Sequence, residues 1–100
     1  MTQVIRRKNI YKITYPNGKI YIGKDLIGEI TYTGSINNEL VESDFLAPED
    51  RKSFTVTKEI LWESFSAEDA EVSKLEVKYI RDFDPNNPKI GYNRWPKFQG

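Results

Sequence analysis

A tight β-hairpin over residues 9–24 is the feature that most constrains the fold of this chain. Its sequence, NIYKITYPNGKIYIGK, predicts two strands, Asn9–Tyr15 and Lys19–Gly23, because β-branched and aromatic residues dominate both segments. The intervening Pro-Asn-Gly at positions 16–18 suits a reversing turn, since proline presets φ and both Asn and Gly tolerate positive φ. The two strands should therefore pair in antiparallel fashion.

Two tyrosines, Tyr11 and Tyr21, are placed one on each predicted strand. An antiparallel register folded about Asn17 would bring the two phenols into one neighbourhood. Spacing alone leaves two interpretations open. They are ordinary strand aromatics with their hydroxyls in water, or they belong to a common site.

Length and composition restrict the chemistry. At 100 residues the chain has room for one domain with a single modest core, preceded by a lead-in at residues 1–8. It contains no cysteine and no histidine, so acid–base chemistry must come from carboxylates, Tyr, Lys or water. No apolar run approaches membrane-spanning length, and no apolar stretch follows the N-terminal charges. We therefore expect a cytoplasmic protein that does not enter membranes.

Charge is unevenly distributed, although the formal net charge is zero. Residues 1–24 hold six basic and no acidic residues, whereas residues 25–50 hold seven acidic and no basic ones. The first segment could contact a phosphate backbone, and the second could bind a protein partner or another copy of the chain. Alternatively, the two segments neutralise each other on the folded surface. The candidate nucleic-acid-binding residues are Arg6, Arg7, Lys8, Lys12 and Lys19.

The middle of the chain predicts short elements. Residues 25–35 lack helical periodicity and predict a loop with at most a short extended piece, Ile30–Thr33. Ser35 or Asn37 could then cap a short helix over Asn38–Ser43. A helical turn is expected around Pro48, followed by a third strand over Ser53–Leu61 that Trp62 closes, with its indole in the core.

A longer helix is predicted from Ala67 to about Asp82, capped by Ser66 and ended by Pro85. Glu76 falls within its apolar stripe, which consists of Val72, Leu75, Tyr79, Ile80 and Phe83. A carboxylate on that face must be neutralised, hydrogen-bonded or turned toward a polar cleft with a cation, unless it bends out to solvent.

Several of these segments resemble the signature of the GIY-YIG nuclease family. Asn-Ile-Tyr at positions 9–11 and Tyr-Ile-Gly-Lys at positions 21–24 match its two-part motif, with Asn9 where the family usually has glycine. Glu76 on a helix, followed by Gly-Tyr-Asn at positions 91–93, is similar to the family's closing elements. The resemblance spans Ile10 to Asn93.

This resemblance implies a small α/β domain with a three-stranded antiparallel sheet flanked by helices, and hydrolysis of DNA phosphodiester bonds. It implies Mg²⁺, or another divalent cation such as Mn²⁺, held by Glu76 with phosphate and water oxygens. Tyr11 would activate or orient the attacking water, and Tyr21 would position water or phosphate. Asn93 would support the site through its amide, and Lys24 would add positive charge. We expect both phenols to share one solvent-accessible cleft with Glu76.

The chain departs from the family pattern where an arginine usually follows the Tyr-Ile-Gly motif. Residues 25–35 contain neither arginine nor lysine, so a cation that stabilises charge on the phosphate is missing there. Arg51 is a candidate substitute if it reaches the cleft, although an isolated arginine is more often a surface residue. The alternative function is therefore a non-cutting module that binds nucleic acid or protein on the same scaffold.

Overall fold

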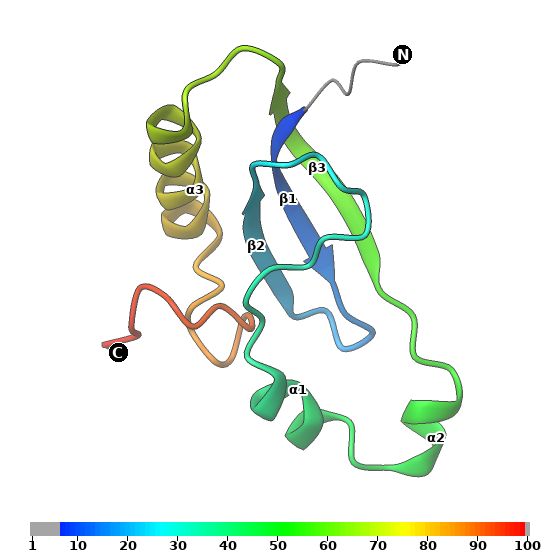
Figure 1. Cartoon of the computed structure of the whole chain (residues 1–100). Helices are drawn as coiled ribbons and strands as arrows, with labels where there is room; N and C mark the ends of the chain where they lie inside the picture. The colour runs from blue at the N-terminus through cyan, green and yellow to red at the C-terminus, as the bar shows by residue number, and fades with distance from the viewer. Residues whose placement is uncertain (1–6, 100) are drawn as a thin grey trace, which may run out of the picture.

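The computed structural model describes residues 7–99, which form a three-stranded antiparallel sheet flanked by helices (Figure 1). The strands are β1 (Lys8–Thr14), β2 (Ile20–Asp25) and β3 (Thr57–Ser64), in the order β2-β1-β3. The helices are α1 (Asn38–Asp44), α2 (Pro48–Lys52) and α3 (Asp69–Phe83). The predicted α/β class and three-stranded antiparallel sheet are confirmed.

The hairpin turn forms as its sequence predicts. Tyr15 N–H donates to the Lys19 carbonyl at 2.9 Å, and Gly18 N–H donates to the Tyr15 carbonyl at 2.9 Å. Gly18 has φ +87°, a left-handed conformation that glycine adopts without a steric penalty. Ile13 pairs with Tyr21 in the resulting register, and Tyr11 pairs with Gly23. The two tyrosines are therefore diagonal neighbours on one face of the sheet.

The third strand begins four residues later than its apolar pattern predicts. Phe54 precedes β3 and packs against Phe45, with ring centroids 4.9 Å apart, so its apolar character serves a loop contact. A β-bulge between Ile10 and Tyr11 inserts one extra residue of β3, because Ile10 pairs with Trp62 and Tyr11 with Ile60. Trp62 therefore lies within the strand, half-buried, and does not close it.

Helix α3 starts and stops for different reasons. Its N-cap is Glu68, without a side-chain hydrogen bond, so the predicted Ser66 cap is wrong. Ser64 Oγ instead accepts hydrogen bonds from the N–H groups of Ser66 and Ala67, which turns the chain before the helix. At the other end Asp84 adopts a left-handed conformation and donates its N–H to the Ile80 carbonyl. The helix thus ends just before Pro85, as predicted.

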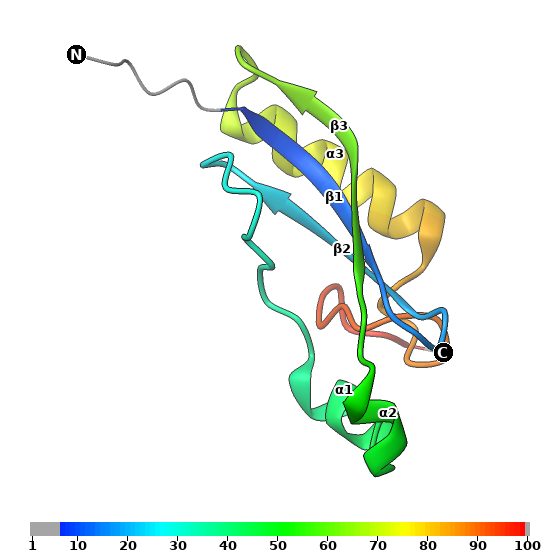
Figure 2. The ribbon, with the colours of Figure 1, turned by 90° about the vertical axis from the view of Figure 1, so that its right-hand side faces the viewer.

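Two apolar clusters lie on opposite faces of the sheet. Alternation along β1 sends Ile10 toward α3 and Tyr11 toward the opposite face. The α3 cluster contains Ile10, Ile22, Ala67, Val72 and Ile80, and the second contains Tyr11, Ile13, Tyr15, Tyr21, Phe45 and Tyr92. Figure 2 shows α3 on one side of the sheet and the connection from β2 to α1 on the other. One face of the sheet is therefore packed by α3, and the other faces the β2–α1 connection.

The β2–α1 connection, residues 26–37, is irregular throughout. The short extended piece predicted at Ile30–Thr33 is a turn and loop. Asn37 caps α1, because its Oδ1 accepts from Leu40 N–H at 3.3 Å, so the second of the two predicted cap residues is the correct one. Over residues 7–99, none of the helices has the length and apolar character needed to cross a membrane.

Candidate active site

The two tyrosines of the hairpin pack together because a glycine lies between them. Their ring centroids are 6.1 Å apart. A Cβ atom on Gly23 would lie 2.5 Å from the Tyr11 hydroxyl oxygen and 2.9 Å from a ring carbon of Tyr21. Any side chain at this position would displace both rings. The glycine that ends the Tyr-Ile-Gly motif therefore has a steric reason to be there.

Tyr11 is buried, which corrects the expectation that both phenols open into a cleft. The residue is 0% exposed, and its hydroxyl has no hydrogen-bond partner within residues 7–99. Gly34 of the β2–α1 connection lies against it, since a Cβ there would be 2.6 Å from the Tyr11 hydroxyl. Burial, and then the neighbouring Tyr21, raise the pKa of the Tyr11 phenol far above its ordinary value. In this conformation Tyr11 cannot reach an attacking water.

Lys58 of β3 holds the connection over Tyr11. Its Nζ lies 4.4 Å from the centroid of the Tyr11 ring. The same ammonium donates to the carbonyls of Ile30 at 2.9 Å and Tyr32 at 2.8 Å. Burial lowers the pKa of Lys58. Lys58 is half-buried within β3, and its contacts with the aromatic face and the carbonyls explain how its charge is tolerated there.

Tyr21 is the phenol that reaches the cleft. Its hydroxyl oxygen accepts a hydrogen bond from Ser35 N–H at 2.9 Å. Burial is the main cause of a raised pKa for the Tyr21 phenol, and the charge of Glu76 adds to it. Tyr21 is therefore neutral at physiological pH. With one lone pair occupied by Ser35, its O–H is available to donate a hydrogen bond into the cleft.

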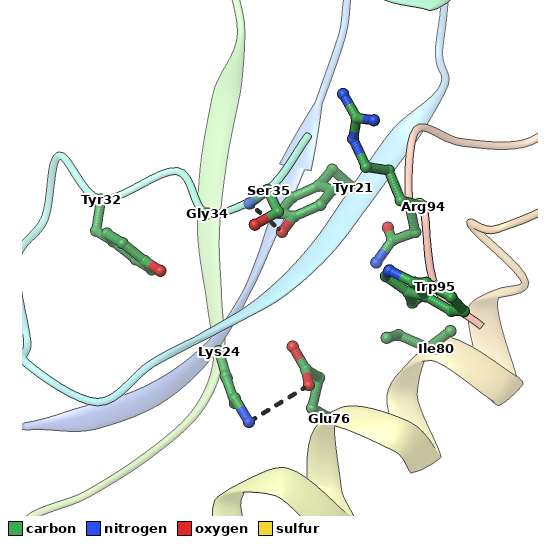
Figure 3. Close-up of a pocket in the computed structure, with 10 residues that line it drawn as sticks. Tyr21, Lys24, Tyr32, Gly34, Ser35, Glu76, Ile80, Arg94 and Trp95 are labelled. Carbon is green, nitrogen blue, oxygen red and sulfur yellow. Dashed lines mark hydrogen bonds and ion pairs between the residues drawn. The ribbon is translucent and has the colours of Figure 1, made fainter. Parts of the chain in front are cut away.

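The cleft has a volume of about 230 Å³ and lies along β2, the edge strand next to α3 (Figure 3). Its walls come from β2, the β2–α1 connection, α3 and the C-terminal segment. The residues that line it are Tyr21, Lys24, Tyr32, Gly34, Ser35, Glu76, Ile80, Asn93, Arg94 and Trp95. Four residues predicted for the site, namely Tyr21, Lys24, Glu76 and Asn93, are thus brought together from three distant parts of the chain.

Glu76 projects from α3 into this cleft. Its side chain is 23% exposed, and Oε1 lies 4.0 Å from Lys24 Nζ, at the limit of an ion pair. Burial raises the pKa of the Glu76 carboxyl, and the Lys24 charge only partly opposes this effect. Lys24 is shared, because its Nζ also donates to Ser73 Oγ at 2.8 Å. Glu76 is thus a partly desolvated carboxylate with one weak cationic partner.

Asn93 has a structural role beside the cleft. Its Oδ1 accepts from Ile22 N–H at 2.8 Å, and its Nδ2 donates to the Ile22 carbonyl at 2.7 Å. The side-chain amide therefore pairs with β2 as the backbone of a neighbouring strand would. These two hydrogen bonds anchor the C-terminal segment, and the second N–H and second lone pair of the amide remain beside the cleft that Asn93 lines.

Arg51 does not supply the missing cation, and that expectation is corrected. Its Nε donates to the Phe45 carbonyl at 2.7 Å, and its NH2 pairs with Glu42 at 2.6 Å. These contacts hold it in a separate hollow beside α1 and α2. The arginine that lines the cleft is Arg94, next to the exposed indole of Trp95. Neither was predicted as a site residue, although they are the two residues after the Gly-Tyr-Asn motif.

The four proposed nucleic-acid-binding residues within residues 7–99 do not line the cleft and are paired with acids. The pairs are Arg7–Glu63 at 3.4 Å, Lys8–Asp69 at 2.7 Å, Lys12–Glu59 at 3.5 Å and Lys19–Asp44 at 2.7 Å. Lys19 belongs to a network in which the Tyr92 hydroxyl donates to Asp44 at 2.7 Å. Arg6 lies outside the described residues. Charge neutralisation on the folded surface therefore accounts for these four side chains.

The oxygen donors of the cleft determine which ions it could hold. Glu76 is the only carboxylate among the lining residues, accompanied by the hydroxyls of Tyr21 and Ser35. Within residues 7–99, no group of three or more His, Cys, Asp or Glu side chains gathers as a metal site. This donor set fits a hard cation such as Mg²⁺ or Mn²⁺ that binds one carboxylate and keeps water and substrate oxygens as its other ligands.

Comparison of the chain with protein-family models, with curated proteins and with solved structures gave no match. The family resemblance therefore rests on the motif residues and their order in the sequence.

Proposed function

We propose that this chain is a divalent-metal-dependent endonuclease that hydrolyses DNA phosphodiester bonds at the cleft along β2. The observation that carries the proposal is the position of Glu76. An apolar helix stripe directs its carboxylate into the cleft that Tyr21 and Lys24 also line, with Lys24 Nζ 4.0 Å from Oε1. A carboxylate that is desolvated without a close cation gains most from a bound cation.

Each residue has a distinct part in the proposed reaction. Glu76 would hold Mg²⁺ or Mn²⁺, which supplies Lewis-acid polarisation of the phosphate when bound. Tyr21 donates a hydrogen bond from its neutral hydroxyl to the attacking water or to a phosphate oxygen, because Ser35 already occupies its acceptor side. Lys24 adds positive charge at the Glu76 end of the cleft. Asn93 positions the C-terminal wall of the cleft through its two hydrogen bonds to Ile22.

A non-cutting module that binds nucleic acid or protein is the second candidate. Its support is the burial of the Tyr11 hydroxyl under Gly34, together with the absence of a basic residue at positions 25–35. A nuclease of the proposed kind has to move the β2–α1 connection if Tyr11 is to contact water. A binding module has no such requirement.

Nicking of supercoiled plasmid distinguishes the two functions. We expect wild-type protein to nick the plasmid with Mg²⁺ or Mn²⁺ and to lose this activity with EDTA. Glu76→Gln keeps the shape and removes the charge, so it should abolish cleavage. Glu71→Gln, an exposed glutamate on the same helix, is the matched control and should cleave as wild type does. Equal nicking by the Glu76 variant would contradict the nuclease assignment, and binding without nicking would favour the second candidate.

A further inference from the structure

Trp95 is an indole without a packing role in the described fold. It is 72% exposed, whereas the other tryptophan, Trp62, packs against the cluster under α3. Trp95 nevertheless lines the cleft and lies beside Ile80 in the close-up (Figure 3). Among the exposed aromatic residues, Trp95 is thus one that lines the cleft, where its indole offers a flat surface to a ligand.

Arg94, the preceding residue, has a guanidinium with free donors. Its one hydrogen bond in the described part of the chain is a long one, from Nε to the Ile36 carbonyl at 3.4 Å. No acidic side chain of residues 7–99 forms an ion pair with it. In Figure 3 its guanidinium points away from Glu76, toward the opposite end of the cleft from Lys24. The two cations of the cleft therefore lie at its two ends.

The segment that carries both side chains is anchored. The paired hydrogen bonds between the Asn93 amide and the Ile22 backbone fix the chain directly before Arg94 and Trp95. A fixed starting point reduces the conformational entropy that these side chains lose when they bind a ligand. The cations at the two ends of the cleft suit the phosphates of a nucleic-acid strand, and the aromatic wall suits a base that is turned toward the protein.

We propose that Arg94 and Trp95 form a platform for one nucleotide of single-stranded DNA, with the guanidinium on a phosphate and the base stacked on the indole. Arg94 contacts a phosphate next to the one that faces Glu76, and its planar fork suits phosphate oxygens. Bases of an intact duplex are stacked and paired, so only an unpaired or extruded base reaches the face of Trp95. If the proposed nuclease function holds, this platform makes single-stranded DNA its substrate. The binding itself does not depend on that function, since binding does not require cleavage.

Fluorescence anisotropy of a labelled oligothymidylate, compared with a duplex of the same length, tests this proposal. The measurement is made with EDTA present, so that cleavage does not interfere. We expect wild-type protein to bind the single strand more tightly than the duplex. Trp95→Ala should weaken single-strand binding by roughly 5- to 150-fold, the range of one lost base stack, and Trp95→Phe should retain most of the affinity.

Two further variants sharpen the test. Phe65→Ala removes an exposed aromatic (56%) outside the cleft and should leave affinity unchanged. Arg94→Gln should weaken binding and reduce the slope of log affinity against log salt by about 0.7, as expected for one lost phosphate contact on a single strand. Equal wild-type affinity for both DNAs, absence of binding, or equal effects of the Trp95 and Phe65 alanine variants would overturn the proposal. Single-strand preference without metal-dependent cleavage of either the plasmid or the oligothymidylate would keep the platform and remove the nuclease.

Discussion

Replacing Gly34 by alanine tests whether the β2–α1 connection seals the tyrosine pair. Gly34 has φ +66°, and a Cβ there would lie 2.5 Å from the Tyr21 hydroxyl oxygen and 2.6 Å from that of Tyr11. Real Cβ atoms essentially never approach other atoms within 3.0 Å. The alanine methyl group can therefore be accommodated only if the connection lifts or both rings move.

The expected loss of stability has two parts. An alanine in the left-handed conformation costs about 1–2 kcal/mol, and forcing a group into a filled space costs about 1–3 kcal/mol. Gly34→Ala should therefore lower the free energy of unfolding by about 2–5 kcal/mol. Gly18→Ala is the matched control, because Gly18 also has a positive φ, +87°, and a Cβ there would meet no other atom within 4 Å. It carries only the conformational cost.

Thermal and urea unfolding followed by circular dichroism measure the difference between the two variants. At this chain length each kcal/mol lowers Tm by about 4–8 °C, so Gly34→Ala should melt clearly below Gly18→Ala. Adding Tyr11→Phe to Gly34→Ala removes one of the two clashing oxygens and should recover part of the loss. Equal unfolding free energies for the two glycine variants would refute the close contact between Gly34 and the phenols.

Three further outcomes follow from polar groups described above. Tyr11→Phe should leave the unfolding free energy unchanged or raise it by about 1 kcal/mol in urea titrations, because the buried hydroxyl lacks a hydrogen-bond partner. A clear loss of stability would mean that the hydroxyl has such a partner. Burial raises the pKa of Glu76 in the folded state above its ordinary value of 4.5, so the charged carboxylate lowers stability at neutral pH. Glu76→Gln should therefore melt at or above wild type at neutral pH, and the gap should close as pH falls through the folded-state pKa toward 4.5. A lower Tm for the variant at neutral pH would indicate a structural ion pair. Hydrogen bonding to Lys19 lowers the pKa of Asp44, so the stability that the charged Asp44 contributes is present above the ordinary value of 3.8 and is lost as pH falls through the folded-state pKa. Asp44→Asn should therefore lower stability by about 1 kcal/mol at neutral pH and match wild type in strong acid. A difference in Tm that does not change with pH would contradict this.

Local patterns predicted the hairpin, the order of elements and the end of α3, because each depends on nearby residues. The turn at Gly18 and the stop before Pro85 follow from backbone preferences that the sequence displays directly. The start of β3 was wrong because Phe54 has the composition of a strand residue but makes a loop contact with Phe45. Alternation alone cannot separate these two uses of an aromatic side chain.

The sequence predicted the positions of Glu76 and Tyr21 at the cleft, but it did not predict that the β2–α1 connection buries Tyr11. Glu76 stood out as a carboxylate on an apolar stripe, and the structure turns it into the cleft. Burial of Tyr11 depends on residues 26–37, whose irregular path is set by the long-range contacts of Lys58 and Gly34. Arg94 required the tertiary structure for the same reason, since only the pairing of Asn93 with β2 brings it to the cleft.

The pairing of Asn93 with Ile22 also determines how the sheet can meet another chain. An edge strand with free N–H and carbonyl groups invites pairing with a strand from a neighbour. Along β2, the Asn93 amide satisfies Ile22, and Ile20 bridges to Gly91, so the edge beside the cleft is closed to such pairing. The outer edge of β3 is the edge of the described sheet that stays open. Strand exchange or aggregation would therefore proceed through β3, on the side of the sheet away from the cleft, and would leave the cleft accessible.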